Sequence, residues 1–269
     1  MKNKLLKILS LSLLLSCSVT ILFASNLVTQ EQCESKDNEE YIFTGGECIQ
    51  YHVSEGEKEE EITIIVHGTW PEGTNTLGRY GPFSDNLSMA TDITTIAVAL
   101  PGYSDSSTNK FKALSHDEKT YLSGQKEYIS FLSVLVESLK ERFDAKRVNY
   151  IGHSAGAMMG STLTGFKPGL IDTLTSAGGV YDIHEKVKNR DDLISLVDYI
   201  DNVDKKTEFL LIYGTKDTIS LPKVTKDFYE VLKQKGFNST LVEVKNAPHL
   251  DLDMRDTSVE AIVNMLDKE

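Results

Sequence analysis

The sequence predicts an α/β fold with a mostly parallel, doubly wound sheet that is flanked by helices. From Tyr51 onward, short apolar runs rich in β-branched residues alternate with longer segments of helical periodicity, which is the pattern of a parallel sheet covered on both faces. The chain has 269 residues, of which 40% are hydrophobic and 25% charged, and this composition excludes disordered, collagen-like and coiled-coil proteins. Because no internal repeat, low-complexity tract or Pro/Gly linker divides residues 25–269, we expect a single domain there.

The charge of the chain argues against nucleic acid as a partner. Lys and Arg number 28 against 40 Asp and Glu, a formal net charge of -12, whereas nucleic-acid-binding domains carry a basic surface. The acidic run at 55–61 is expected to be a solvated turn before the first buried strand. We also expect no cofactor and no metal site, because no His or further Cys stands near Cys33 and Cys48 at ligand spacing.

The first 24 residues have the pattern of a signal peptide. Lys2 and Lys4 precede an apolar run without acidic residues, and the apolar stretch 8–23 is 16 residues long, short of the roughly 20 that a membrane-spanning helix needs. We therefore assign 1–24 as a signal peptide, exclude it from the fold and expect a periplasmic or secreted protein.

Two processing sites compete in this segment. The sequence Leu-Leu-Ser-Cys at 14–17 resembles a bacterial lipobox, which would place a lipid on Cys17 and anchor the protein to a membrane. Ala24 is the small residue that ordinary signal peptidase requires before its cut. The chain stays apolar after Cys17 through Phe23, where a lipoprotein would more usually continue as a polar tether, and this favours the cut after Ala24.

The cut after Ala24 leaves two of the three cysteines, Cys33 and Cys48, in the mature chain. In an oxidising compartment they can form a disulfide, which would contribute about 3 kcal/mol by the chain-entropy estimate. The alternative is two unpaired thiols.

Strands and helices alternate along the rest of the chain. Six runs rich in apolar and β-branched residues are predicted strands: 62–66, 94–100, 148–151, 170–175, 209–213 and 240–244. Between and after them lie the predicted helices: 119–143, 155–164, 221–235 and 257–266. The segment 181–206 is charged but has apolar residues at helical spacing. It predicts a short helical cap over one end of the sheet or, equally, an ordinary crossover helix.

A Gly-x-Ser-x-Gly element at 152–156 is the centre of the functional hypothesis. It follows a predicted strand and opens a helix of small residues, which is the strand-turn-helix setting of a nucleophile elbow. Gly152 and Gly156 would prevent collisions in such a sharp turn, and Ser154 would be exposed above the sheet edge as the nucleophile. The backbone N–H of Ala155 would then face the developing oxyanion. The alternative is that Ser154 simply caps the helix.

A serine nucleophile needs a base and a carboxylate that orients that base. His249 and Asp217 each follow a predicted strand, so both fall in loops at the carboxyl ends of strands, where the nucleophile also lies. The order Ser154, Asp217, His249 is the one expected for this arrangement. Asp182, which follows the strand after the elbow, is the alternative acid.

A second oxyanion donor is expected in the loop after the first predicted strand. There the chain reads His-Gly-Thr-Trp, where Gly68 allows a close approach of the backbone and the N–H of Thr69 or Trp70 would meet the oxyanion. Trp70 is also a candidate wall of an acyl pocket, the alternative being that it covers the core. In the segment 181–206, Tyr181 and His184 are candidate substrate contacts.

These residues together resemble the α/β-hydrolase family over nearly all of the mature chain. The resemblance is carried by five motifs in the family's order: His67-Gly68, Pro-Gly-Tyr-Ser-Asp-Ser-Ser at 101–107, the elbow at 152–156, Gly214-x-x-Asp217 and Pro248-His249. It implies the α/β-hydrolase fold with an eight-stranded, mostly parallel sheet. It also implies a two-step acyl transfer in which Ser154 attacks a carbonyl and His249 passes its proton to the leaving group.

The branch of the family is indicated by the elbow. Its Ser-Ala-Gly is similar to that of carboxylesterases and related formamidases or peptidases, whereas the His-Gly-Gly-Gly of esterases resembling hormone-sensitive lipase is replaced by His-Gly-Thr-Trp. We therefore expect a serine hydrolase whose substrate is a small or medium carboxylic ester, because the cap segment is short. The alternatives are a peptidase, amidase or thioesterase with the same triad and, in a different class, a catalytically inactive binding protein with this fold.

Overall fold

The computed structural model describes residues 27–36, 40–117 and 119–267. The expected signal peptide at 1–24, with both candidate processing sites at Cys17 and Ala24, lies outside these residues. Within them, no helix has the length and apolar character that a membrane crossing requires.

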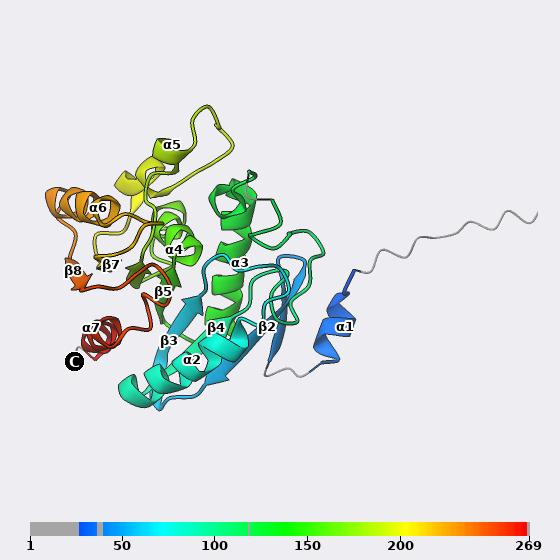
Figure 1. Cartoon of the computed structure of the whole chain (residues 1–269). Helices are drawn as coiled ribbons and strands as arrows, with labels where there is room; N and C mark the ends of the chain where they lie inside the picture. Colours follow the sequence, from blue (N-terminus) through cyan, green and yellow to red (C-terminus); the bar gives the residue numbers. More distant parts are fainter. Residues whose placement is uncertain (1–26, 37–39, 118, 268–269) are drawn as a thin grey trace, which may run out of the picture.

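Eight strands of the described chain form one sheet in the order β1-β2-β4-β3-β5-β6-β7-β8 (Figure 1). β2 pairs with β1 and with β4 in antiparallel orientation, and the other neighbouring strands are parallel. The predicted mostly parallel sheet and its eight strands are therefore confirmed. The strands are β1 (Tyr41–Thr44), β2 (Glu47–Ser54), β3 (Lys58–Val66), β4 (Ile93–Val98), β5 (Arg147–His153), β6 (Thr173–Ala177), β7 (Glu208–Gly214) and β8 (Ser239–Val244).

Five helices of more than ten residues in the described chain flank this sheet: α2 (Leu77–Thr91), α3 (Lys126–Arg142), α4 (Ala155–Phe166), α6 (Pro222–Gln234) and α7 (Asp256–Leu266). On one face, α2 and α7 pack against side chains that include Ile65 and Ile212. On the other face, α3, α4 and α6 pack against side chains that include Ile64 and Leu211. Neighbours such as Ile64 and Ile65 reach different cores because successive side chains of a strand point to opposite faces. The central strands are thus buried on both sides, which is why they read as nearly continuous apolar runs.

Four elements were not among the predicted ones, and the prediction of a turn at 55–61 was partly wrong. α1 (Gln30–Glu34), β1, β2 and α2 are additional. α2 contains Gly81 and Pro82, residue types that disfavour a helix interior, so its local pattern does not indicate a helix. β3 begins at Lys58, so residues 58–61 belong to a strand instead of the expected turn. The pairing of β3 with β4 shifts register between Lys58 and Ile62.

Two predicted elements begin later than expected. The strand predicted at 170–175 is β6, which begins at Thr173, and the helix predicted at 119–143 is α3, which begins at Lys126 after the short 3₁₀ helix η1 (Leu122–Gly124). Leu170 and Ile171, just before β6, are buried in the core. The apolar sequence pattern therefore begins before β6 does, because buried side chains of the preceding loop are apolar as well.

The segment 181–206 contains three short helices, α5 (Ile183–Lys186), η2 (Leu196–Asp198) and η3 (Ile200–Asn202). The alternative of an ordinary crossover helix was therefore wrong. Ile183 and Leu193 are buried against Met158 of α4, and α5 with the long loop beside it forms the top of the molecule in Figure 1.

A disulfide joins Cys33 of α1 (Gln30–Glu34) to Cys48 of β2, which confirms the predicted pairing. Both cysteines are buried. The N–H of Val28, just before α1, donates to the Asn109 side-chain oxygen (2.9 Å), and the Asn109 amide donates back to the Val28 carbonyl (2.8 Å). The N-terminal helix is thus attached to the antiparallel edge of the sheet by one covalent link and by hydrogen bonds.

Replacing both cysteines by serine should lower the free energy of unfolding by about 3 kcal/mol, because the disulfide spans 15 positions and restricts the unfolded chain. Urea unfolding of the Cys33→Ser, Cys48→Ser variant and of the oxidised wild-type protein measures the difference. Reduced wild-type protein serves as the control and should unfold like the variant. Equal unfolding midpoints for the variant and the oxidised protein would contradict the prediction.

Candidate active site

Ser154 stands in a sharp turn between β5 and α4. Its backbone has φ 55° and ψ -114°, in the positive-φ region that residues other than glycine rarely adopt. A side chain at Gly152 would overlap the backbone of Gly156, and a side chain at Gly156 would overlap the carbonyl of Val66 in β3. The two glycines therefore permit the turn, which has the geometry of a nucleophile elbow.

The Ser154 hydroxyl makes no capping hydrogen bond to α4, so the alternative of a simple helix cap was wrong. Its oxygen lies 2.8 Å from Nε2 of His249, and Nδ1 of His249 lies 2.7 Å from Oδ2 of Asp217. An ionised carboxylate only accepts hydrogen bonds, so Nδ1–H donates to Asp217 and Nε2 accepts from the hydroxyl. The three side chains form one continuous chain of hydrogen bonds.

Asp217 is buried, with 3% of its surface exposed, and each of its carboxylate oxygens has a partner. Oδ1 accepts the backbone N–H groups of Ile219 and Ser220, both at 2.8 Å. Burial works to raise the pKa of Asp217, but hydrogen bonds from His249 and from these two N–H groups outweigh it and hold the pKa below its ordinary value. Asp217 is thus an ionised acceptor that is fixed in one orientation.

These three side chains gather at one edge of the sheet. Ser154 follows β5, Asp217 follows β7 and His249 follows β8, and the carboxyl ends of parallel strands meet at one edge. Gly178, after β6, has φ 61°, and a Cβ there would lie 3.1 Å from Cε1 of His249 and 3.3 Å from Oδ2 of Asp217. The sequence analysis missed Gly178, although the pair Gly178-Gly179 beside a predicted strand was an available signal.

His153, the residue before Ser154, contacts the loop that contains His249. Its Nε2–H donates to the backbone carbonyl of His249 at 2.8 Å, and the centroids of the two rings lie 4.9 Å apart. The elbow therefore holds the backbone of the candidate base as well as its side chain. The sequence analysis assigned His153 no role, and no local signal could have found a contact between residues 96 positions apart.

His67 fixes the loop after β3. Nδ1–H donates to the Gly68 carbonyl (2.7 Å), and Nε2 accepts the N–H of Leu100 (3.1 Å) just after β4. Burial has the largest effect on the pKa of His67 and lowers it, the hydrogen bond to Gly68 raises it, and the nearby His153 lowers it further. The resulting pKa is about 4. His67 is therefore a neutral side chain that bridges the ends of two neighbouring strands.

Gly68 brings the loop after β3 against the candidate nucleophile. A Cβ on Gly68 would lie 2.9 Å from Cβ of Ser154. Across the described residues, the backbone N–H groups of Thr69, Trp70 and Ala155 form no hydrogen bond, so they are free to bind an oxyanion. Thr69 and Trp70 both stay predicted donors.

Trp70, a candidate wall of an acyl pocket, does not line the pocket beside Ser154. Its side chain is half-buried and packs against the core, the Arg79 guanidinium lies 5.1 Å from the centre of its ring, and its carbonyl accepts the Tyr103 hydroxyl at 2.8 Å. The alternative prediction, that the Trp70 side chain covers the core, is confirmed.

The two candidate substrate contacts, Tyr181 and His184, lie elsewhere. Tyr181 is buried, with its hydroxyl 2.9 Å from the Ser176 hydroxyl and its ring stacked on Phe228 at 4.0 Å. Burial raises the pKa of Tyr181 to about 12. The His184 ring is partly exposed and lies 3.0 Å from the Asp198 carboxylate. Neither side chain lines the pocket beside Ser154, because the core holds Tyr181 and a hydrogen bond to Asp198 holds His184 outside the pocket.

The alternative acid, Asp182, caps α5 instead of approaching His249. Its Oδ1 accepts the N–H of His184 at 2.9 Å. The structure therefore pairs Asp217, and not Asp182, with His249.

A small pocket opens beside Ser154, with a volume of about 150 Å³. It lies between the elbow, η1, α5 and the loop that holds Asp217. Its lining is mostly apolar and comprises Tyr121, Ser123, Ser154, Ala155, Met158, Gly178, Val180, Ile183, Lys186, Ile219, Ser220 and His249.

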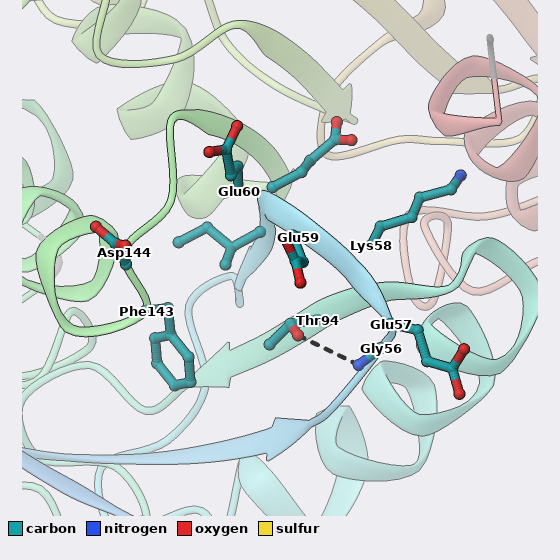
Figure 2. A pocket seen from close by; sticks show the side chains of 10 residues that line it. Gly56, Glu57, Lys58, Glu59, Glu60, Thr94, Phe143 and Asp144 are labelled. Atoms are coloured by element: carbon teal, nitrogen blue, oxygen red, sulfur yellow. Dashed lines mark hydrogen bonds between the residues drawn. The ribbon is translucent and has the colours of Figure 1, made fainter.

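A second pocket, of about 320 Å³, lies at the opposite edge of the sheet, where β3 begins (Figure 2). Glutamates at 57 and 59–61 surround it together with Asp144 and Phe143. Glu60 and Glu61 are ion-paired with Lys146 and Arg147. Its lining includes no serine, cysteine or histidine, and the described residues include no cluster that could hold a metal ion. This pocket has no part in the site around Ser154.

Comparison with known proteins agrees with this architecture. A model of the alpha/beta hydrolase fold matches residues 63–204. Among solved structures, the chain is similar to the Pyrococcus furiosus esterase Pf2001, with 16% identity and a TM-score of 0.64 over 88% of this chain and 94% of that one. It is also similar to Est1E from Butyrivibrio proteoclasticus bound to ferulic acid (14% identity, TM-score 0.61, 84% and 96% covered) and to the enol-lactonase from Burkholderia xenovorans (14%, 0.62, 85% and 100%). At such identities the likeness is one of fold. No curated protein matches the chain.

The low pKa of His67 should make stability depend on pH. The unfolded chain binds a proton at this residue near pH 6.5 and the folded protein only near pH 4, so stability should fall as the pH drops between these values, by up to about 3 kcal/mol. Urea unfolding at pH 7 and pH 4 should therefore show a smaller loss for His67→Gln than for wild-type protein. The same substitution at the exposed His116 is the control. Equal losses in wild type and His67→Gln would mean that His67 is not the group responsible.

Proposed function

The chain belongs to the α/β-hydrolase fold family, and on that premise we propose that it is a serine hydrolase that cleaves a small or medium carboxylic ester. The observation that carries the proposal is the unbroken hydrogen-bond chain from Ser154 through His249 to Asp217, at 2.8 and 2.7 Å. A nucleophile, a base within reach of its proton and a carboxylate that orients the base are what acyl transfer requires.

In the first step, Oγ of Ser154 attacks the ester carbonyl carbon while Nε2 of His249 takes the hydroxyl proton. Asp217 accepts Nδ1–H throughout and stabilises the imidazolium that forms. The carbonyl oxygen becomes an oxyanion, for which the free N–H of Ala155 and that of Thr69 or Trp70 are the donors. The ester C–O bond then breaks, and the proton on Nε2 passes to the leaving alcohol.

In the second step, water attacks the acyl group on Ser154. His249 takes the proton of the water and returns it to Oγ as the acyl bond to Ser154 breaks, which releases the carboxylic acid and restores the free enzyme. No cofactor or metal takes part in either step. The partner we propose is a small-molecule ester, with nucleic acid disfavoured by the net charge of -12.

Two findings support an ester as the substrate and an extracytoplasmic location. Est1E is bound to ferulic acid and the Pyrococcus furiosus protein is named an esterase; these likenesses extend to the fold, so the ester is our proposal for this chain. The disulfide between Cys33 and Cys48 fits an oxidising compartment and accords with a secreted or periplasmic protein exported by residues 1–24. A lipid on Cys17 is the alternative that would bring the protein to a membrane.

A fluorophosphonate probe tests the nucleophile without knowledge of the substrate. We expect the probe to modify Ser154, because His249 activates its hydroxyl, and peptide mass spectrometry locates the adduct. Ser154→Ala is the control and should remain unlabelled with an unchanged circular dichroism spectrum. A folded wild-type protein that does not react would remove the hydrolase proposal and favour an inactive binding protein.

Kinetics of three variants test the roles in the triad. His249→Ala should lower kcat by about 10⁴-fold, because the base is lost. Asp217→Asn should cost less, but still orders of magnitude, whereas Asp182→Asn should stay near the wild-type rate. A greater loss in Asp182→Asn than in Asp217→Asn would reassign the acid. The measurement is ester turnover, and a matched amide in the same assay separates an esterase from an amidase.

A further inference from the structure

The pocket beside Ser154 has one formally charged group that is not part of the triad. Its apolar walls come from Tyr121, Met158, Val180, Ile183 and Ile219, which belong to different segments of the chain. The charged group is the ammonium of Lys186, the last residue of α5. An apolar pocket with a few placed polar groups is the usual form of a small-molecule site, and the polar groups set its specificity.

Several of the other polar side chains of the pocket are already engaged. Ser220 donates its hydroxyl to the Gly179 carbonyl (2.7 Å), and the Ser123 hydroxyl is directed at the sulfur of Met158 (3.9 Å). Ser154 and His249 are bonded to each other. The groups left to recognise a substrate are the Tyr121 hydroxyl and the Lys186 ammonium, and of these the ammonium carries the charge.

Lys186 has no ion-pair partner within 4.0 Å in the described part of the chain. Some exposed lysines, such as Lys146, Lys167 and Lys223, are paired with carboxylates, whereas others, such as Lys188, have no such partner among the described residues. Lys186 differs from these lysines because it lines the pocket beside Ser154. An unpaired ammonium at the pocket is thus available to an anionic group from outside the protein.

The size of the pocket limits the apolar part of the substrate. Its volume of about 150 Å³ is that of a cavity able to hold a benzene-sized group. Sites for drug-sized ligands are larger, roughly 300 to 1,000 Å³. An acyl group on Ser154 must lie in the space around that residue. A short chain or one ring therefore fits, and α5 forms one side of the space that holds it.

We propose that Lys186 is a specificity-determining residue, and that the preferred acyl group is short and apolar and ends in a carboxylate that pairs with the Lys186 ammonium. The substrate class is thus the half-esters of short dicarboxylic acids. This inference rests on the proposed function, since it concerns the acyl group that Ser154 would carry. At long range the acidic protein repels such a substrate, and Lys186 offsets this repulsion locally within the screening length of about 8 to 10 Å.

The test compares two esters of equal chain length, p-nitrophenyl hexanoate and the p-nitrophenyl half-ester of adipic acid, in which a carboxylate replaces the terminal methyl. We expect wild-type protein to favour the half-ester in kcat/KM. In Lys186→Met this preference should fall by up to about fivefold, the upper end of the range for a solvent-accessible ion pair. The change should lie in KM and leave kcat similar, because the ion pair forms in the ground state and in the transition state alike.

Three control variants and added salt make the result specific. Lys186→Arg retains the charge and should keep the preference. Lys188→Met removes an exposed lysine two positions away that does not line the pocket, and it should change nothing. Ser154→Ala supplies the blank for spontaneous hydrolysis, and 0.5 M NaCl should weaken the wild-type preference by screening.

The outcomes separate the inference from the function on which it rests. Ser154-dependent hydrolysis of the hexanoate together with an unchanged substrate ratio in Lys186→Met would overturn the role of Lys186 and leave the esterase proposal intact. An equal fall of the ratio in Lys188→Met would attribute the preference to net charge and would also overturn it. Failure of wild-type protein to hydrolyse either ester would remove the proposed function and this inference with it.

Discussion

The site depends on the close approach of α4 to β3 at Gly156. A side chain there would overlap the Val66 carbonyl, and a side chain at Gly152 would overlap the backbone at Gly156. Because neither position holds a Cβ, the chain reverses within one turn and leaves Ser154 at φ 55°, a conformation that costs an ordinary residue about 1 to 3 kcal/mol. The packing of the two flanking elements stabilises this turn, and the other groups of the site are arranged around it.

Three histidines hold the loops around Ser154 through bonds that specify which ring nitrogen carries the proton. His67 joins the ends of β3 and β4, His153 holds the carbonyl of His249, and His249 lies between Asp217 and Ser154. In His67 the Nδ1–H donates and Nε2 accepts, so the ring has to be neutral, in accord with its pKa of about 4. The same residue type thus serves as a buried brace and as a candidate base, and the difference comes from burial and partners.

The linings of the two pockets differ in charge. Glutamates gather where β3 begins, around the pocket in Figure 2, and two of them are paired with Lys146 and Arg147. At the other end, Lys186 has no partner among the residues described. Since the chain is acidic overall, an anionic ligand would meet net repulsion at long range, which the Lys186 ammonium would offset locally at the pocket beside Ser154.

The sequence by itself determined the class of the fold, six of the eight strands, the disulfide partners, and the choice of Ser154, Asp217 and His249 as candidates. These properties are local: periodicity reports burial, and chain order places a residue at the end of a strand. Only the tertiary structure decided that Tyr181 stacks in the core and that Trp70 covers the core. It also decided that His153 bonds to the backbone of His249 and that Gly178 leaves room for the His249 ring. α2 also depended on packing, because Gly81 and Pro82 weaken its local pattern. Such contacts join residues that are distant in the chain. They are determined by side-chain packing in the folded protein, and the spacing of residues in the sequence does not reveal them.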